Sequence, residues 1–296
     1  MQIKTVLKTI RPPFLVLTPV CVFLGLSTSL ATESPVNLFV VFLVMSGAIS
    51  AHISVNTLNE FFDFKSGLDF KTEKTSFSGG SGALPDSPEM AGTILALGLA
   101  SLMVTVVIGI YLVLERGAQI LPIGLAGVVL VITYTQWINR FPFLCLIAPG
   151  LGFGVFMVVG THVVLTGGYS ELPWFVPLVP FFLVNNLLLI NQYPDIKADA
   201  SIGRNTFPIA FGLNKSNITY TFSFLAAYSL ILINIFREHL PSLGFIAVIP
   251  AVFSLFALLG VSKYALKIGD YPQYMGANVA AAILTPLLLG VSILNG

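Results

Sequence analysis

The sequence predicts an all-α integral membrane protein, a bundle of nine transmembrane helices with its N-terminus in the cytoplasm. Three observations support this prediction. Of the 296 residues, 56% are hydrophobic and 9% are charged, whereas about a quarter of the residues in an ordinary soluble domain are charged. The apolar residues form runs long enough to cross a hydrocarbon core of about 30 Å as helices. The basic residues lie almost entirely in alternate connections between these runs.

Nine apolar runs are expected to cross the membrane, because each is sustained and then interrupted by polar residues, proline or glycine. The runs are residues 13–31, 36–62, 91–114, 119–136, 143–167, 173–193, 217–236, 243–266 and 274–294. The interruptions after the first eight runs include residues 33–35, 63–65, 115–117, 139–140, 167–168, 194–195, 237–238 and 267–270. The first run resembles a signal peptide but lacks a small-residue cleavage site, so we expect it to be retained as a helix.

The distribution of basic residues gives the orientation. Nine crossings place the N-terminus and the connections after the second, fourth, sixth and eighth runs on one face. Twelve of the 14 basic residues lie on that face, leaving Arg116 and Arg237 opposite. Positive charge marks the cytoplasmic side, so the sequence predicts a multi-pass protein of the inner cell membrane. It has no basic stripe that would bind nucleic acid.

Two long polar connections, residues 63–89 and 194–215, lie on the same predicted cytoplasmic face, together with nine of the 13 acidic residues. The opposite connections are short. We therefore expect one transmembrane domain, residues 1–296, in which these two connections form a cytoplasmic cap and carry the function.

Each long connection begins with a similar motif. The first contains Asn59, Asp63 and Asp69, and Gly67 is expected to end the helix so that Asp69 returns from a loop. The second contains Asn191, Asp195 and Asp199, spaced by four as on one face of a helix. Pro194 is expected to loosen or kink that helix.

The membrane environment argues that these polar groups share a pocket. An aspartate costs about 2.5–3.5 kcal/mol at the centre of a membrane helix, so such residues usually face a watery cavity. Amides upstream of the aspartates, inside the runs, also need partners. These amides belong to Asn56, Asn59, Asn185, Asn186 and Asn191. Both runs are therefore expected to line one polar pocket.

Clustered carboxylates and amide oxygens without neighbouring His or Cys suit Mg²⁺, which commonly binds through one or two carboxylates plus substrate phosphates. Two such clusters predict two ions bridged by a diphosphate. The neighbouring cations are expected to hold phosphate oxygens; they are Lys65, Lys71, Lys74, Lys197 and Arg204. The apolar interior behind this site predicts that the other end of the substrate is a hydrocarbon, as in an isoprenyl diphosphate.

Two glycine-rich stretches are open to more than one interpretation. The segment "SFSGGSG", residues 76–82, is either an anion-binding nest of backbone N–H groups or a flexible linker. Gly150, Gly152 and Gly154 lie inside an apolar run without the strand context of a nucleotide-binding loop. We therefore expect them to serve close helix packing.

The motifs "NEFFDFKSGLD" and "NQYPDIKADASIGRNT" resemble the two Asp-rich motifs of the UbiA superfamily of intramembrane prenyltransferases, and "RPPFLVLTPVCVFLG" is similar too. The resemblance covers most of the chain and implies nine helices and Mg²⁺ dependence. It implies that Asn59, Asp63 and Asp69 hold the first Mg²⁺–diphosphate cluster, and that the second motif holds the other. The sequence departs from the pattern at Glu60, where an aspartate is common.

Within the superfamily, the step from Asp63 to Asp69 looks most like the menaquinone branch, which prenylates 1,4-dihydroxy-2-naphthoate. The resemblance places Tyr134 near the reacting carbon, with catalytic Asp63 and Asp195, and Arg140 as a substrate-binding cation. Tyr134 is alternatively an aromatic residue of the membrane interface. His52 and Asn56 are candidates for contact with the acceptor, although a lone buried His is more often structural.

These observations predict an enzyme that transfers a polyprenyl group from its diphosphate to an aromatic small molecule, with 1,4-dihydroxy-2-naphthoate losing its carboxylate. Other acceptors remain open: 4-hydroxybenzoate, homogentisate, chlorophyllide and glyceryl phosphate. A membrane transporter is the alternative from another class, and it would place polar groups near the midplane on discontinuous helices.

Overall fold

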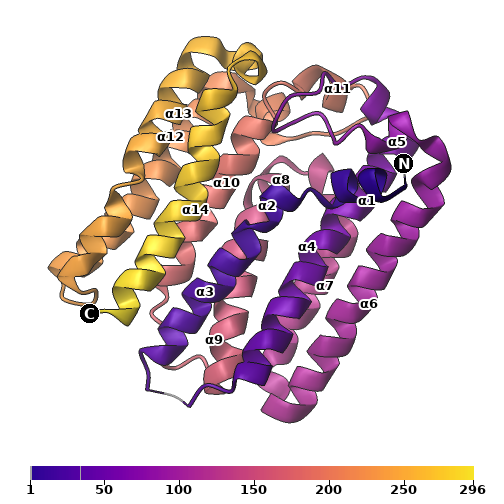
Figure 1. Cartoon of the computed structure of the whole chain (residues 1–296). Helices are drawn as coiled ribbons and strands as arrows, with labels where there is room; N and C mark the ends of the chain where they lie inside the picture. Colours follow the sequence, from indigo (N-terminus) through magenta and orange to yellow (C-terminus); the bar gives the residue numbers. More distant parts are fainter. Residues whose placement is uncertain (1, 34) are drawn as a thin grey trace.

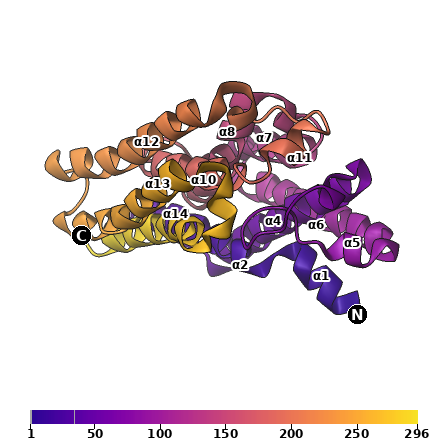
Figure 2. The ribbon, with the colours of Figure 1, turned by 90° about the horizontal axis from the view of Figure 1, so that it is seen from above.

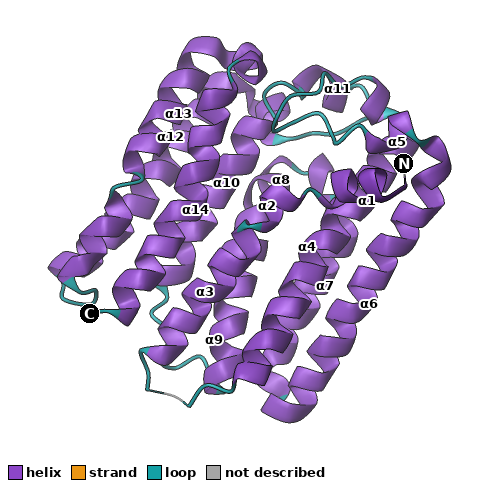
Figure 3. Ribbon diagram, viewed as in Figure 1, coloured by secondary structure: helices purple, strands orange, loops and turns teal. Residues whose placement is uncertain are grey.

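The computed structural model describes residues 2–33 and 35–296, and within these ranges the protein contains helices and no strand (Figure 3). The helices are α1 (Gln2–Ile10), α2 (Pro12–Leu15), α3 (Leu17–Leu30), α4 (Leu38–Ser66), α5 (Ala83–Asp86), α6 (Ala91–Arg116), α7 (Leu121–Thr133), α8 (Pro142–Gly150), α9 (Val158–Thr166), α10 (Phe175–Asn191), α11 (Ile196–Ala200), α12 (Phe207–Phe236), α13 (Ala251–Tyr264) and α14 (Pro272–Leu294). The all-α class predicted from composition is confirmed.

Seven stretches are helical, long and apolar enough to cross a membrane. They are Ile3–Leu30, Leu38–Ser66, Pro88–Arg116, Pro142–Thr166, Phe207–Phe236, Ser242–Asp270 and Pro272–Leu294. Two shorter apolar helical stretches, Ala118–Thr133 and Phe175–Asn191, coincide with the fourth and sixth predicted runs. The chain is therefore a multi-pass membrane protein, while the count of nine crossings and the orientation of the N-terminus stay predictions.

The long helices run side by side, and the end-on view shows α10 among the surrounding helices (Figures 1 and 2). Helix α10 packs against α12, α8 and α14. Its buried residues Val176, Val179 and Leu183 join Leu24 of α3 and Leu289 of α14 in one apolar core. This core fixes the helices whose ends carry the polar motifs.

Two helices extend beyond the predicted apolar runs. Helix α4 continues past residue 62 to Ser66, so Asp63 is helical, and it ends as expected where Gly67 adopts a left-handed φ of 77°. Helix α12 begins at Phe207, ten residues before the predicted run, because Pro208 suits a first helical turn. Gly212, with φ 79°, interrupts its helical backbone, so the segment before this break continues the polar connection as helix.

The polar connections gather at one end of the bundle. The N-terminus, the segment that leads into α5, and α11 lie together at the top of Figure 1, and the C-terminus lies at the opposite end. This arrangement agrees with the prediction that residues 63–89 and 194–215 share a face. Their assembly into a cap domain stays a prediction.

The glycine string is a packing element at two of its three positions. A Cβ atom on Gly150 would lie 2.3 Å from the Phe181 carbonyl oxygen, and one on Gly154 would lie 2.3 Å from the Phe181 backbone nitrogen. Gly152 is different, since a Cβ there would meet Leu130 at an ordinary 3.4 Å. Glycine at 150 and 154 thus allows this helix to approach the α10 backbone.

We expect Gly154→Ala to destabilise the protein by about 1–3 kcal/mol, because the added methyl group must push the α10 backbone away. Gly152→Ala is the matched control and should change stability little. Thermal unfolding in detergent measures both variants. Equal melting temperatures for the two would show that close packing at Gly154 is not required.

Candidate active site

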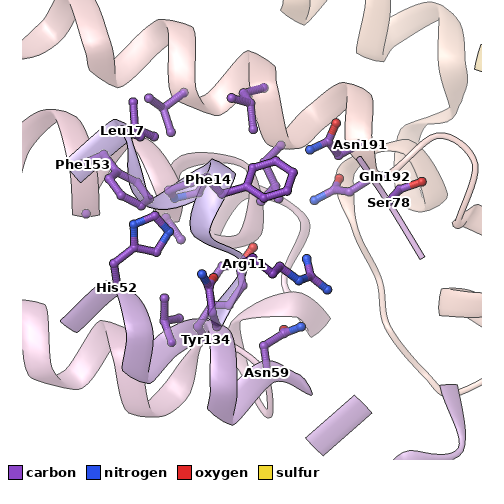
Figure 4. Close-up of a pocket in the computed structure, with 18 of the residues that line it drawn as sticks. Arg11, Phe14, Leu17, His52, Asn59, Ser78, Tyr134, Phe153, Asn191 and Gln192 are labelled. Atoms are coloured by element: carbon purple, nitrogen blue, oxygen red, sulfur yellow. The ribbon is translucent and has the colours of Figure 1, made fainter. Parts of the chain in front are cut away.

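A cavity of about 310 Å³ lies between the helices near the end that carries the polar connections. Its lining comes from segments far apart in the sequence, and Figure 4 shows Asn191, Gln192 and Ser78 at one side and His52 with Phe153 at the other. The cavity thus has a polar region and an apolar, aromatic region. Both predicted motifs contribute side chains to its polar region.

The first motif reaches the cavity from the last turns of α4. Asn59 and Asp63 both line it, and they lie one helical turn apart. The Asn59 side-chain amide donates a hydrogen bond to Asp63 Oδ2 at 2.9 Å, and the Thr135 hydroxyl donates to Asn59 Oδ1 at 3.2 Å. The extension of α4 therefore fixes the direction in which the Asp63 carboxylate points.

The second motif does not lie on one continuous helix, which corrects the expectation from its four-residue spacing. Helix α10 ends at Asn191, and α11 resumes at Ile196. Pro194, which lacks an N–H donor, lies between the two helices. Asn191, Asp195 and Asp199 nevertheless all line the cavity. The break lies at Pro194, where a loosened or kinked helix was expected.

Arg204 connects the two motifs. Its Nη2 donates to Asp63 Oδ1 in a short contact, and its Nη1 donates to Asp199 Oδ1 at 3.0 Å. All three side chains are largely buried, with exposed fractions of 14% for Arg204, 9% for Asp63 and 6% for Asp199. One guanidinium therefore compensates two carboxylates from opposite halves of the chain.

Among the residues that the structure describes, two buried carboxylate oxygens at this end lack a hydrogen-bond partner. They are Asp69 Oδ2 and Asp195 Oδ1, and both atoms are buried. Asp69 follows Gly67 in a short 3₁₀ turn, Leu68–Phe70, so the prediction that it returns from a loop is confirmed. Buried carboxylate oxygens without donors are ligands of the hard type that Mg²⁺ takes, and the residues present therefore fit such an ion.

The ligands are not gathered into a ready-made carboxylate cage. Within residues 2–33 and 35–296, no group of three or more His, Cys, Asp or Glu side chains is arranged to hold a metal. Like charges repel when no cation separates them, and Arg204 lies between Asp63 and Asp199. The donor set fits Mg²⁺ that shares its coordination with amide, water and substrate oxygens.

Burial raises the pKa of two carboxyl groups in the connections, those of Asp69 and Asp195. The pKa of Asp69 is raised to about 7 by burial and by the charges of Glu60 and Asp63. The pKa of Asp195 is raised to about 7 by burial and by Asp199, against the Gly79 hydrogen bond that lowers it. Both groups therefore exchange protons near neutral pH.

The glycine-rich segment, residues 76–82, is an ordered element that contacts both motifs. The Gly79 N–H donates to Asp195 Oδ2 at 3.1 Å, and the Ser81 N–H donates to both Glu60 carboxylate oxygens at 3.2 Å. Gly79 and Gly80 adopt φ values of 81° and 73°, which favour glycine. The segment thus binds anions through its backbone, as a nest would, and these anions are the protein's own carboxylates.

Sequence reasoning missed several residues that line the polar region, above all Arg11, and also Ser78, Asn139 and Gln192. Arg11 was present in the "RPPF" stretch, but its cation was counted only toward orientation. In the structure its Nη2 donates to Glu60 Oε2 at 3.2 Å, and its backbone has a left-handed φ of 57°. A non-glycine residue in that conformation is a signal of a functional constraint, but it is visible only in the structure.

Arg204 is the one predicted diphosphate-binding cation that the structure brings to the cavity among those it describes. The other five are exposed and absent from its lining: Lys65, Lys71, Lys74, Lys197 and Arg140. Lys65 lies 5.9 Å from the centre of the Phe61 ring, and Lys71 donates to the Ser201 hydroxyl at 3.2 Å. These long side chains point toward water, where their charge is easily solvated.

The predicted acceptor residues all line the cavity. Tyr134 follows the last residue of α7 directly. His52 Nδ1 shares a 2.8 Å hydrogen bond with the Thr18 hydroxyl, and its ring meets Phe153 edge-on at 4.7 Å. The Asn56 amide donates to the Ile10 carbonyl at 3.0 Å. His52 and Asn56 thus have internal partners, and their contact with an acceptor stays a prediction.

Comparison with known proteins identifies the family. The model of the UbiA prenyltransferase family matches residues 17–268. The chain belongs to the UbiA prenyltransferase family. A solved UbiA homolog from Archaeoglobus fulgidus, bound to DMAPP and Mg²⁺, superimposes with a TM-score of 0.70 over 98% of this chain and 99% of that one, at 12% identity. At that identity the similarity shows a shared fold.

Two curated UbiA relatives are similar in sequence. A 1,4-dihydroxy-2-naphthoate octaprenyltransferase from Bacillus subtilis (strain 168) is 28% identical over 65% of this chain and 61% of its own length. The UbiA prenyltransferase domain-containing protein 1 of Dictyostelium discoideum is 26% identical over 63% of this chain and 57% of its own length. The chain thus spans about three fifths of the length of these relatives.

We expect Mg²⁺ to bind more weakly as the pH falls below about 7. Asp69 and Asp195 have pKa values raised to about 7, so acid protonates the groups that Mg²⁺ needs ionised, and binding must release protons. Calorimetric titration with Mg²⁺ in detergent, at about pH 6 and about pH 8, should give the higher affinity at the higher pH. Equal affinities would show that protons do not compete with the metal.

Proposed function

We propose that this protein transfers a polyprenyl group from an isoprenyl diphosphate to an aromatic acceptor in an Mg²⁺-dependent reaction, and that the acceptor is 1,4-dihydroxy-2-naphthoate, as in menaquinone biosynthesis. The observation that carries the proposal is the division of the cavity. Asp63, Asp195 and Arg204 lie in its polar region, and Phe153 and Met157 line its apolar part. A ligand with an anionic head and a hydrocarbon tail matches both regions.

The polar region would hold the diphosphate. Asn59, Asp63 and Asp69 would bind one Mg²⁺, and Asn191, Asp195 and Asp199 a second. Bound Mg²⁺ would neutralise the charge that develops on the departing diphosphate. Arg204 already lies between the motifs and would donate hydrogen bonds to phosphate oxygens. The solved homolog that is bound to DMAPP and Mg²⁺ supports the use of Mg²⁺ and of a prenyl diphosphate.

The apolar region would guide the reaction. As the carbon–oxygen bond breaks, positive charge develops on the allylic carbon, and an aromatic face stabilises a nearby cation. Tyr134 supplies such a face on the cavity lining. The acceptor ring carbon would then form the new carbon–carbon bond. Loss of the carboxylate as CO₂ would return its bonding electrons to the ring and restore aromaticity.

The naphthoate acceptor is supported by the Bacillus subtilis relative, whose name states this substrate class. The carrier alternative lacks comparable support, because the motifs gather at one end of the bundle and not along its middle. The proposed location is the inner cell membrane, with the active site facing the cytoplasm. The basic residues that predicted this orientation support it.

The decisive experiment supplies purified protein in detergent with Mg²⁺, a polyprenyl diphosphate and a panel of acceptors, following diphosphate release and product mass. A prenylated naphthoquinol formed together with CO₂ is the expected result. A prenylated product of 4-hydroxybenzoate or glyceryl phosphate alone would keep the transferase and replace the acceptor. Lack of any product from folded protein would contradict the proposed activity.

We expect Asp63→Ala and Asp195→Ala each to lower turnover by on the order of a hundredfold or more, because each removes a carboxylate from the proposed metal–diphosphate site. EDTA should abolish activity in the unmodified protein, and added Mg²⁺ should restore it. Asp270→Ala is the matched control, since Asp270 is exposed and lines no part of the cavity. Normal turnover by either site variant would refute its assignment.

A further inference from the structure

Glu60 lies within the first motif but does not line the cavity. It is 1% exposed, and both of its carboxylate oxygens are engaged. The Ser81 N–H lies 3.2 Å from each oxygen, the Ser81 hydroxyl contacts Oε1 closely, and Arg11 Nη2 donates to Oε2 at 3.2 Å. These donors engage both oxygens of the Glu60 carboxylate. Glu60 therefore binds Ser81 and Arg11, whereas Asp63 lines the cavity.

One partner of Glu60 lines the cavity, and the other lies beside residues that do. Arg11 lines the cavity from the junction between α1 and α2. Ser81 belongs to the glycine-rich segment, of which Ser78, Gly79 and Gly80 also line the cavity. Glu60 therefore joins three pieces of the chain at the polar region: the N-terminal segment, the end of α4 and the glycine-rich segment.

The other contacts of the glycine-rich segment lie mostly before Gly80, so the hydrogen bonds from Ser81 to Glu60 hold its second half. Ser78 N–H donates to the Thr75 hydroxyl at 2.9 Å, which forms a local turn. The Phe77 ring packs edge-on against Phe14 at 6.4 Å. Beyond Gly79, the next hydrogen bonds to the body of the protein run from Ser81 to Glu60. Without them, Gly80 and Gly82 provide freely rotating backbone on both sides of Ser81.

We propose that Glu60 is a positioning residue that latches the glycine-rich segment and Arg11 against the polar region of the cavity. The inference rests on the proposed function for its kinetic consequence. The latch holds the glycine-rich segment, whose Gly79 N–H donates to Asp195. Glu60 of the first motif therefore helps to position Asp195 of the second motif. The glutamate is needed in place of aspartate because the extra methylene carries the carboxylate out to Ser81.

The latch is tested first without activity. Trypsin cleaves after Lys71 and Lys74, which are exposed and precede the segment. In Glu60→Ala and Glu60→Asp we expect cleavage at these two sites, identified by mass spectrometry, to be faster by on the order of tenfold, because local opening becomes easier. Glu60→Gln keeps an acceptor for Ser81 and should show a smaller increase. Glu89→Gln, at an exposed carboxylate that lies outside both cleavage sites, is the matched control and should be cleaved at the unmodified rate.

Kinetics separate positioning from general destabilisation. We expect Glu60→Asp to raise the KM for the prenyl diphosphate by on the order of tenfold, with the KM for the aromatic acceptor and kcat changed less than about twofold. Ser81→Ala should reproduce part of this effect, and its combination with Glu60→Ala should add little more. Equal changes in both KM values, or a loss of active protein with unchanged KM values, would overturn positioning.

The cleavage rates test the latch, and the activity measurements test the proposed function, so the two can be contradicted independently. Unmodified protein without activity on any acceptor would contradict the proposed function, and the cleavage rates would still test the latch. Unchanged cleavage in Glu60→Ala, Glu60→Asp and Ser81→Ala would overturn the latch whatever the enzyme does. If Glu60→Ala does not fold, Glu60→Gln and Ser81→Ala supply the same comparison.

Discussion

The buried contact of Arg204 with Asp63 and Asp199 is the constraint on which the polar end of the molecule depends. Along the chain, Asp63 lies 141 residues from Arg204, and Asp199 lies five residues from it. Removing one partner of a buried ion pair leaves an uncompensated charge and typically costs about 3–5 kcal/mol. The two halves of the bundle are thus tied at their motif-bearing ends by a charge requirement as well as by apolar packing.

Charge at this end remains unbalanced after that contact. Five acidic side chains gather here, those of Glu60, Asp63, Asp69, Asp195 and Asp199. Arg11 forms an ion pair with Glu60, and Arg204 forms ion pairs with Asp63 and Asp199. Burial and the neighbouring carboxylates raise the pKa values of Asp69 and Asp195 to about 7. A site that must take up either protons or metal cations is suited to Mg²⁺, which supplies positive charge.

Much of the fold could be predicted because apolar length and helix-ending residues act locally. The end of α4 at Gly67 and the return of Asp69 were readable from the sequence for this reason. Arg204 was predicted correctly as a cation of the cavity. The lysines were not predicted correctly, because the direction of a lysine depends on where its helix ends and which surface meets water. Lys65 and Lys71 turn outward, and Arg11 turns inward. The partner of Glu60 was equally hidden, since Ser81 lies 21 residues away in a glycine-rich segment without a fixed secondary structure.

The apolar half of the cavity depends on a distortion in the helix opposite His52. Pro149 lies within α8, and the chain then widens into a π-helical turn, Leu151–Met157, before α9. Such turns are rare and commonly occur at functional sites. This one places Gly152, Phe153 and Met157 along the cavity, and Phe153 contacts the His52 ring. A hydrocarbon lining of this kind disfavours water. Under the proposed function, it would let an allylic cation meet the aromatic acceptor before it met a water molecule.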